Sequence, residues 1–251
     1  MTGALTGKRI VVTGASRGLG RAVAIACARE GASLALACHT RTAEVDAVAA
    51  DIAARGGQRP TVAAFDHTDA PAVLAAASRF DDALGGIDAW VNNAAENLPG
   101  LFVTSDPERL ARQIAVALVG PMLCARAAIE IMMRHRRGVL LNVSSVAAVR
   151  PARGQAAYAA AKAGLEGLTR ALAVEYAKKG IRVLCLRPGP IDTDMLAPTK
   201  LLAEGEVTAR TPLGRPATVA EVAEHAVFML SDRAAYATGS VVTVDGGYVV
   251  A

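Results

Sequence analysis

The chain is poor in aromatic residues and in cysteine. Phe, Trp and Tyr make up 4% of its 251 residues, and the net charge is only +4. Few stacking side chains and a modest charge argue against a nucleic-acid-binding protein. The four cysteines have no CxxC spacing and stand in apolar sequence, so we expect buried thiols and no disulfide or metal site: Cys27, Cys38, Cys124 and Cys185.

Long hydrophobic runs are also missing. Charged residues interrupt each apolar run, whereas a helix that crosses a bilayer needs roughly 20 apolar residues. The first residues show no signal-like hydrophobic stretch. We therefore expect a cytoplasmic protein that does not bind membranes. At 53% hydrophobic residues, the chain can form one globular domain over residues 1–251.

Apolar segments typical of buried strands alternate with segments of helical spacing. The expected strands are 8–13, 33–38, 61–65, 87–91, 138–144, 181–187 and 240–244, and the clearest helices are 18–30, 43–55, 70–83 and 155–179. This alternation predicts an α/β fold, a Rossmann-like doubly wound parallel sheet of about seven strands with helices on both faces. The segment Asp106–His135 keeps apolar spacing for unusually long, which is typical of either a subunit interface or a helix buried on its own sheet.

The first expected strand runs directly into a glycine-rich turn. Glycines there permit a tight turn and let a pyrophosphate approach the backbone N–H groups at a helix N-terminus. A glycine triplet also occurs in ordinary strand-to-helix turns, but its place within the first thirty residues favours a dinucleotide site. The candidate contacts are Gly14, Ser16, Arg17, Gly18, Leu19 and Gly20.

The end of the second expected strand carries no acidic residue. NAD-binding proteins place a carboxylate there to bind a ribose 2′-OH, and that carboxylate would repel the 2′-phosphate of NADP. His39 and Arg41 stand at this point instead, and Arg17 in the glycine turn adds a second guanidinium. The pattern favours NADP(H), although both arginines would also be ordinary as solvent-facing charges.

Tyr158 and Lys162 stand four residues apart in an expected helix, thirteen and seventeen residues after Ser145. That spacing places the phenol and the ammonium on one helix face, where the cation is expected to lower the phenol pKa from its usual value of about 10. Ser145 follows an apolar strand, the position where open α/β sheets bind ligands. Together the three side chains are able to reduce a carbonyl, although Tyr and Lys at this spacing are also common on surfaces.

These motifs resemble, in order, those of the short-chain dehydrogenase/reductase family. Residues 13–20 match its TGxxxGxG, 92–95 nearly match NNAG, 158–162 match YxxxK, and 187–193 match its PG turn. The resemblance covers nearly the whole chain. The C-terminal residues 230–247 and the spacing from Ser145 to Tyr158 resemble most the β-ketoacyl-acyl carrier protein reductases, so Ser145 is preferred over its neighbour Ser144.

The resemblance implies an activity and a set of site residues. It implies hydride transfer from NADPH to a carbonyl carbon, with Tyr158 as proton donor, Ser145 polarising the carbonyl, and Lys162 holding the ribose. The further cofactor contacts that it implies are Asp66, His67, Asn93, Ala94, Ala95, Pro188, Gly189, Ile191 and Thr193. For Asp66, a helix N-cap is the competing role.

Two positions depart from the family. Ala117 stands where the family has an asparagine that helps to hold a proton-relay water, and Ala95 replaces the glycine of NNAG. Neither change removes the proton donor, so we expect an active enzyme. Residues 194–216 resemble the family's substrate lid.

The resemblance also implies a substrate and partners. It implies a β-ketoacyl substrate in fatty-acid or polyketide biosynthesis, and a homotetramer. We expect an acyl carrier protein to dock near Arg136 and Lys179, although cations at helix ends are also ordinary dipole partners. The alternatives are a reductase or dehydrogenase of a free small alcohol, sugar or steroid, and a non-catalytic NADP-binding regulatory protein.

Overall fold

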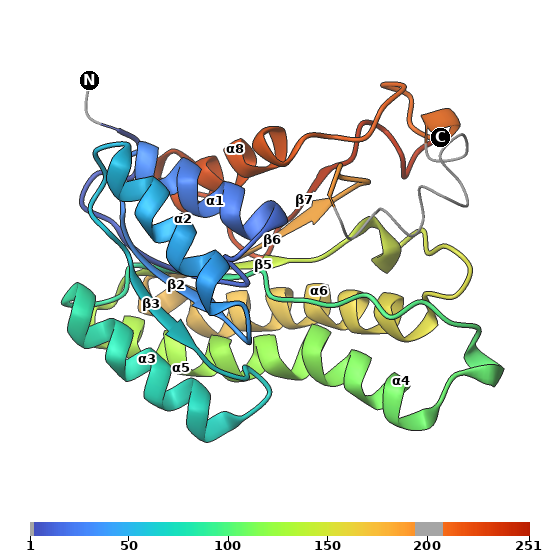
Figure 1. The fold of residues 1–251 in the computed structure, drawn as a ribbon, viewed down its shortest axis with the longest axis horizontal. Helices are drawn as coiled ribbons and strands as arrows, with labels where there is room; N and C mark the ends of the chain where they lie inside the picture. Colours follow the sequence, from blue (N-terminus) through green and yellow to red (C-terminus); the bar gives the residue numbers. More distant parts are fainter. Residues whose placement is uncertain (1–2, 194–207) are drawn as a thin grey trace.

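A seven-stranded sheet forms the centre of the computed structural model, which describes residues 3–193 and 208–251 (Figure 1). All strands are parallel, in the order β3-β2-β1-β4-β5-β6-β7. Their bounds are β1 Arg9–Thr13, β2 Ser33–Cys38, β3 Thr61–Ala64, β4 Ala89–Asn92, β5 Gly138–Val143, β6 Ile181–Pro188 and β7 Val241–Val244. The predicted doubly wound parallel sheet is confirmed.

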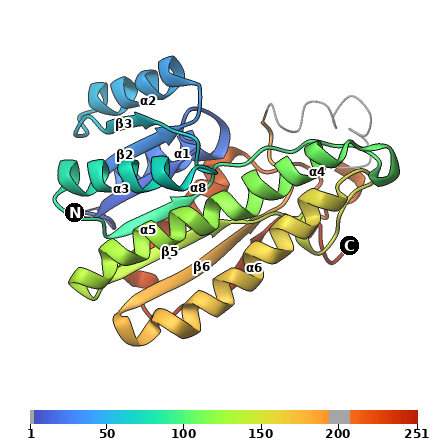
Figure 2. The same cartoon turned by 90° about the horizontal axis from the view of Figure 1, so that it is seen from below.

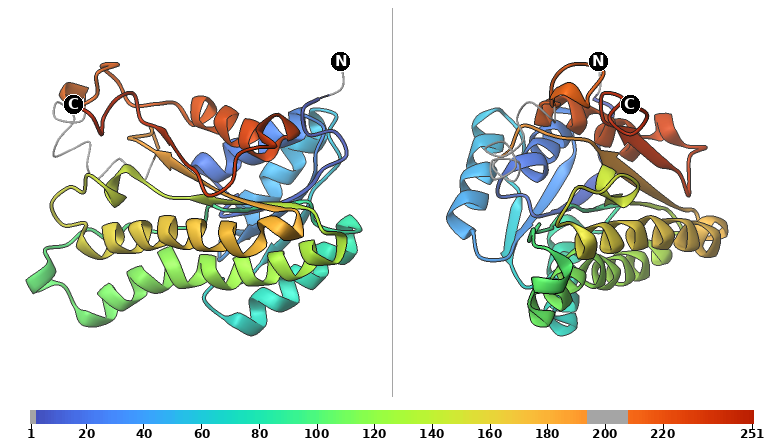
Figure 3. Two further views of the ribbon diagram at one scale, coloured as in Figure 1. Left: turned by 180° about the vertical axis from the view of Figure 1, so that it is seen from behind. Right: turned by 90° about the vertical axis from the view of Figure 1, so that its right-hand side faces the viewer.

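The central strands are buried on both faces, because helices cover each side of the sheet. Ile10 and Val12 belong to one apolar core and Val11 to the other, as the alternation of side chains along a strand requires. The helices on the Ile10 side are α1 Gly18–Arg29, α2 Thr42–Ala54 and α8 Val219–Leu230. Those on the opposite side are α3 Ala70–Leu84, α5 Gly120–His135 and α6 Ala156–Tyr176, and Figures 2 and 3 show the two layers.

One long helical run crosses the second layer. It consists of α4 Pro107–Ile114, the π-helical turn η2 Ala115–Val119 and α5. By length and composition this run meets a criterion for a bilayer-spanning helix, although Arg112 and Arg126 interrupt its apolar residues as expected. Half of its most apolar window is buried, and Cys124, Ala128 and Met132 pack in the core against the sheet. Helices that pack in a protein core can have the length and composition of a bilayer-spanning helix, and this run packs in the core.

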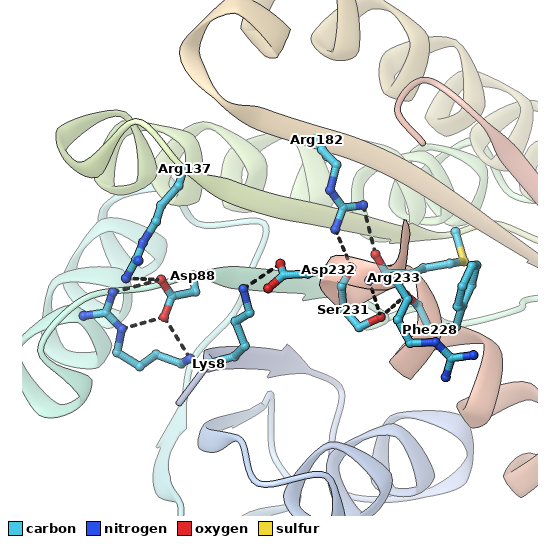
Figure 4. Close-up of polar contacts among 10 residues, drawn as sticks. Lys8, Asp88, Arg137, Arg182, Phe228, Ser231, Asp232 and Arg233 are labelled. Atoms are coloured by element: carbon cyan, nitrogen blue, oxygen red, sulfur yellow. Dashed lines mark hydrogen bonds and ion pairs between the residues drawn. The ribbon is translucent and has the colours of Figure 1, made fainter. Parts of the chain in front are cut away.

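The amino edge of the sheet is closed by polar contacts (Figure 4). Asp88 binds Arg9 at 2.7 Å and Arg137 at 3.0 Å, which joins the start of β4 to β1 and to the segment before β5. Arg182, on β6, donates to the carbonyls of Met229 and Ser231 at the end of α8. These side chains occupy the amino edge of the sheet, and the ligand-sized cavity lies at the opposite, carboxyl edge.

The four cysteines are free and buried, as predicted. Burial raises the pKa of Cys27 and of Cys124 to about 12, so both thiols stay protonated and unreactive at neutral pH.

Candidate active site

A cavity of about 520 Å³ lies at the carboxyl edge of the sheet. Loops that follow β1 to β6 line it. The strand order reverses between β1 and β4, and open α/β sheets bind ligands in the crevice at such a reversal. Every predicted catalytic and cofactor-binding residue lines this cavity.

The glycine turn between β1 and α1 has the shape that a dinucleotide pyrophosphate needs. Gly14 has a φ of +65°, and a Cβ there would lie 2.8 Å from the Cα of Ala94. Gly18, with a φ of +55°, begins α1, so the first N–H groups of that helix face the cavity. The turn therefore fits the pyrophosphate of a nicotinamide dinucleotide.

The hydroxyl of Thr13 connects the glycine turn to the loop after β4. Its Oγ1 donates to the carbonyl of Val91 and accepts from the backbone N–H groups of Asn93 and Ala94, each at 3.1 Å. Asn93 Nδ2 returns a hydrogen bond to the Thr13 carbonyl at 3.0 Å. The two loops that face the cofactor position are therefore held together by the protein itself.

The three basic residues predicted to bind a 2′-phosphate line one end of the cavity. Arg41 Nη1 lies 2.9 Å from Glu44 Oε1, and His39 Nε2 lies 3.8 Å from Asp66 Oδ2. The sequence reasoning missed Glu44, which stands one helical turn after Arg41. Both members of that pair are about half exposed, and such pairs contribute little, so a phosphate can replace the carboxylate.

Asp66 and His67 form the wall between this end and the helical run. Asp66 Oδ1 accepts from the N–H and the hydroxyl of Thr68, at 2.8 and 2.7 Å, and these bonds lower its pKa. The competing helix-cap role is wrong, because the N-cap of α3 is Asp69. His67 Nε2 lies 2.9 Å from the carbonyl of Val116, and burial lowers the pKa of this imidazole.

The helix α6 presents Tyr158 and Lys162 on one face beside Ser145. Tyr158 is 8% exposed and Lys162 is 2% exposed. Lys162 Nζ lies 5.6 Å from the Tyr158 ring centroid and donates to the carbonyl of Val143 at 2.7 Å. The Ser145 hydroxyl accepts from the N–H of Ala147 at 3.2 Å and acts on the neighbouring phenol to lower the pKa of Tyr158. The structure thus brings the predicted trio together at the end of β5.

Burial sets the charge states of this trio. It raises the pKa of Tyr158 to about 12, against the hydrogen bond from Ser145, and lowers the pKa of Lys162 to about 8. The expected lowering of the phenol pKa by Lys162 is therefore wrong for the protein alone, because loss of water around the ring outweighs the nearby cation. At neutral pH the phenol keeps its proton and the ammonium keeps its charge.

Ser144, the alternative serine, also lines the cavity, but its hydroxyl is bonded to other protein groups. Its side chain is buried, and Oγ donates to Glu166 Oε1 at 2.9 Å. Glu166 in turn binds Arg187 through two contacts of 2.8 and 2.6 Å. The sequence reasoning missed this pair, although Glu166 stands four residues after Lys162 on an otherwise apolar helix face.

Ala117 lies in the π-helical turn η2 and is fully buried against Tyr158, Ala147 and Ala161. Its neighbours Ala115 and Val116 line the cavity. A π-helical turn inserts one residue and leaves a carbonyl without its regular partner, and such turns are frequent at functional sites. The methyl group therefore packs behind the tyrosine rather than facing the cavity.

The PG turn after β6 closes the remaining side of the cavity. Gly189 donates to the carbonyl of Val244 at 2.9 Å, and a Cβ on this glycine would lie 2.6 Å from the Cα of Asp245. Pro188, Ile191 and Thr193 line the cavity beside it. Most of the predicted lid, 194–216, lies outside the described residues. Across residues 3–193 and 208–251, no group of three His, Cys, Asp or Glu side chains is placed to hold a metal ion.

The residues predicted to dock a carrier protein lie at the amino edge of the sheet, opposite the cavity. Arg136 ends α5, just before β5 begins, and Lys179 stands just before β6 begins. The cavity is at the carboxyl ends of these strands, about 20 Å away at 3.3 Å per residue. Arg134 and Arg137, on either side of Arg136 in the sequence, have carboxylate partners in Asp81 and Asp88. Docking of a carrier protein at Arg136 and Lys179 stays a prediction.

Comparison with known proteins identifies the family. The family described as Enoyl-(Acyl carrier protein) reductase matches residues 14–249. The 3-oxoacyl-[acyl-carrier-protein] reductase FabG of Chlamydia muridarum is 36% identical over 98% of this chain and 99% of its own, and a 3-oxoacyl-[acyl-carrier-protein] reductase of Bos taurus is 39% identical over 96% and 97%.

Solved structures show the same likeness. A putative NAD(P) dependent gluconate 5-dehydrogenase from Beutenbergia cavernae with bound NADP has a TM-score of 0.93 at 35% identity, over 98% of each chain. A gluconate 5-dehydrogenase from Burkholderia cenocepacia in complex with NADP and tartrate has a TM-score of 0.93 at 28% identity, over 98% and 97%. The chain belongs to the short-chain dehydrogenase/reductase family of oxidoreductases.

Proposed function

We propose that this protein is an NADPH-dependent ketoreductase that reduces the keto group of a β-ketoacyl substrate, in fatty-acid or polyketide biosynthesis. The observation that carries the proposal is the placement of Ser145, Tyr158 and Lys162 together in one cavity that the glycine turn also lines. The curated relatives named as 3-oxoacyl reductases support the choice of substrate.

In this proposal the trio acts on the carbonyl oxygen. When bound, NADPH supplies the hydride that adds to the carbonyl carbon. The Tyr158 hydroxyl donates its proton to the oxygen, and the Ser145 hydroxyl donates a second hydrogen bond that polarises the C=O bond. Lys162, charged below pH about 8, holds a ribose hydroxyl and stabilises the phenolate that the proton transfer leaves.

The preference for NADP(H) is part of the proposal. Arg17, His39 and Arg41 line the end of the cavity that follows β2, where they would bind the 2′-phosphate. NADP is the cofactor in two of the similar solved structures, from Beutenbergia cavernae and Burkholderia cenocepacia. The remaining predicted contacts, from Gly14 to Thr193, would hold the rest of the dinucleotide.

A second candidate is a reductase or dehydrogenase of a free small hydroxy compound. The observation that favours it is the polar lining of the cavity, which includes Glu96, Arg112 and Arg150, together with the similar structures named as gluconate 5-dehydrogenases. A homotetramer and a cytoplasmic location stay predictions.

The test is NADPH oxidation with acetoacetyl thioesters and with simple keto compounds. Tyr158→Phe is expected to lower kcat by about 10²- to 10⁴-fold, because it removes the proton donor, while NADPH binding by fluorescence titration is retained. Tyr176→Phe, on the same helix, is the matched control. A wild type that binds NADPH but reduces no carbonyl would instead favour the non-catalytic regulatory protein.

A further inference from the structure

Arg150 occupies a fixed position at the tyrosine end of the cavity. It follows the short helix η3 Val146–Ala148, and its N–H donates to the carbonyl of Val146 at 2.8 Å. The rest of its loop is pinned by Gln155, whose Oε1 accepts from the N–H of Ala152 at 2.9 Å. The loop lines the same cavity as the Ser145 and Tyr158 hydroxyls. Its backbone therefore holds Arg150 near the reaction centre.

The guanidinium of Arg150 is oriented by Tyr248, near the end of the chain. Its Cζ lies 5.2 Å from the Tyr248 ring centroid, and Nη1 donates to the Tyr248 carbonyl. Within the part of the chain that the structure describes, neither Nε nor Nη2 has a hydrogen-bond partner. The stacking of the guanidinium on the Tyr248 ring and the bond from Nη1 thus hold the side chain in place, while Nε and Nη2 stay available to a ligand.

No described carboxylate neutralises Arg150. Arg112, another cation of the cavity lining, is neutralised by Glu96 through contacts of 2.7 and 3.3 Å, whereas the Lys162 ammonium beside Tyr158 donates to a backbone carbonyl. Asp66 lines the same cavity, but its Oδ1 accepts two hydrogen bonds from Thr68 and it faces His39 at the phosphate end. The cavity thus carries an uncompensated positive charge beside its candidate proton donor.

A half-buried cation without a carboxylate partner suits an anionic ligand. Next to an uncharged acyl chain, the guanidinium would lose water and gain no hydrogen bond in return. A carboxylate offers two oxygens that match the donor geometry of an arginine. The oxygens would approach from the cavity, since the ring of Tyr248 covers one face of the guanidinium.

We propose that Arg150 binds a carboxylate of the substrate, so that the substrate is a keto acid. The proposal rests on the carbonyl reduction proposed above and specifies its substrate class. The carboxylate belongs either to a free keto acid or to an acyl thioester that ends in a second carboxyl group. Arg150 then orients the substrate so that its keto oxygen reaches Tyr158 and Ser145.

The test compares acids with their neutral esters at saturating NADPH. The free pair is acetoacetate and methyl acetoacetate, and the thioester pair is 3-oxoadipyl N-acetylcysteamine and its methyl ester. We expect the wild type to prefer the acid in at least one pair, and Arg150→Met to lower the acid-to-ester ratio of kcat/KM by about 10- to 100-fold. Arg150→Lys should keep part of the preference. Arg153→Met, three residues away, exposed and outside the cavity lining, is the matched control and should leave the ratio unchanged.

A binding measurement separates this proposal from the proposed function. Calorimetry with the inert pair glutarate and dimethyl glutarate, added to the protein with bound NADP⁺, reports the carboxylate site without turnover. Tighter binding of glutarate that disappears in Arg150→Met supports the site even if no carbonyl is reduced, in which case only the proposed function fails. If Arg150→Met loses the same affinity for the acid as for the ester and also has a lower Tm, Arg150 only anchors Tyr248, and the proposal is overturned. A dependence on Arg150 that is confined to a coenzyme A thioester, compared with its N-acetylcysteamine analogue, would assign the site to a phosphate and would also overturn it.

Discussion

Replacing Glu166 with glutamine should destabilise the protein strongly, because it leaves a buried cation unpaired. The Glu166 side chain is 5% exposed and that of Arg187 is 16% exposed, and two contacts of 2.6 and 2.8 Å join them. Removing one partner of a buried ion pair costs about 3 to 5 kcal/mol. Glutamine keeps one acceptor oxygen for Arg187 or Ser144, so we expect the lower end of that range.

The expected shift is large enough for a simple assay. For a domain of this size, 1 kcal/mol corresponds to about 2 to 4 °C in Tm, so Glu166→Gln should lower Tm by roughly 6 to 12 °C. Thermal unfolding followed by circular dichroism, with urea unfolding as a second measure, gives both quantities. The control is Glu224→Gln, which breaks an exposed pair with Arg29 and should change stability by less than about 1 kcal/mol.

A second variant tests the cause. Glu166→Leu combined with Arg187→Met removes both charges, and it should recover much of the stability lost by Glu166→Gln. The reasoning is refuted if Glu166→Gln unfolds at the same temperature as Glu224→Gln. It is also refuted if the double variant is less stable than the single one, because the loss would then not come from an uncompensated charge.

Two further predictions concern charge. Burial lowers the pKa of Lys162 to about 8 from 10.5, so between these pH values the unfolded chain binds one more proton than the folded one, and this group makes stability rise with pH. The unfolding free energy of wild type minus that of Lys162→Met should therefore increase by roughly 1 kcal/mol from pH 8 to 9. Urea titrations that give the same difference at both pH values would contradict this prediction. Arg41→Ala should raise the Kd for NADP⁺ by roughly tenfold or more and leave that for NAD⁺ nearly unchanged, because only the former has the 2′-phosphate. Arg59→Ala, outside the cavity, is the control, and an equal loss for both dinucleotides would argue against the phosphate contact.

The features that the sequence predicts are those set by local pattern. Each strand lies within two residues of its expected bounds, because apolar runs buried on both faces are hard to mistake when helices alternate with them. The glycine turn and the pair Tyr158 and Lys162 are local in the same sense, since a turn or a single helix face fixes their geometry. Their place at one cavity follows from the parallel order of the strands.

The features that the sequence does not predict depend on contacts between distant segments. Arg150 is oriented by Tyr248, which follows it by 98 residues, and Glu166 meets Arg187 only because α6 packs on β6. The direction in which the pKa of Tyr158 shifts depends on how completely its ring is buried, and the sequence spacing of Tyr158 and Lys162 does not reveal this burial. The docking prediction stays untested: the charge of Arg136 and Lys179 is visible in the sequence, but the edge of the sheet on which they lie is not.

The bonds made by the Thr13 hydroxyl have a consequence for the thermodynamics of ligand capture. Because this oxygen joins the turn after β1 to the loop after β4, these two loops are already at the separation that binding requires before any dinucleotide arrives. Capture then requires little ordering of backbone, so more of the contact energy shows as affinity. A protein with valine at this position would keep only the bonds from Asn93 Nδ2 between the two loops, so binding would have to order the loops further.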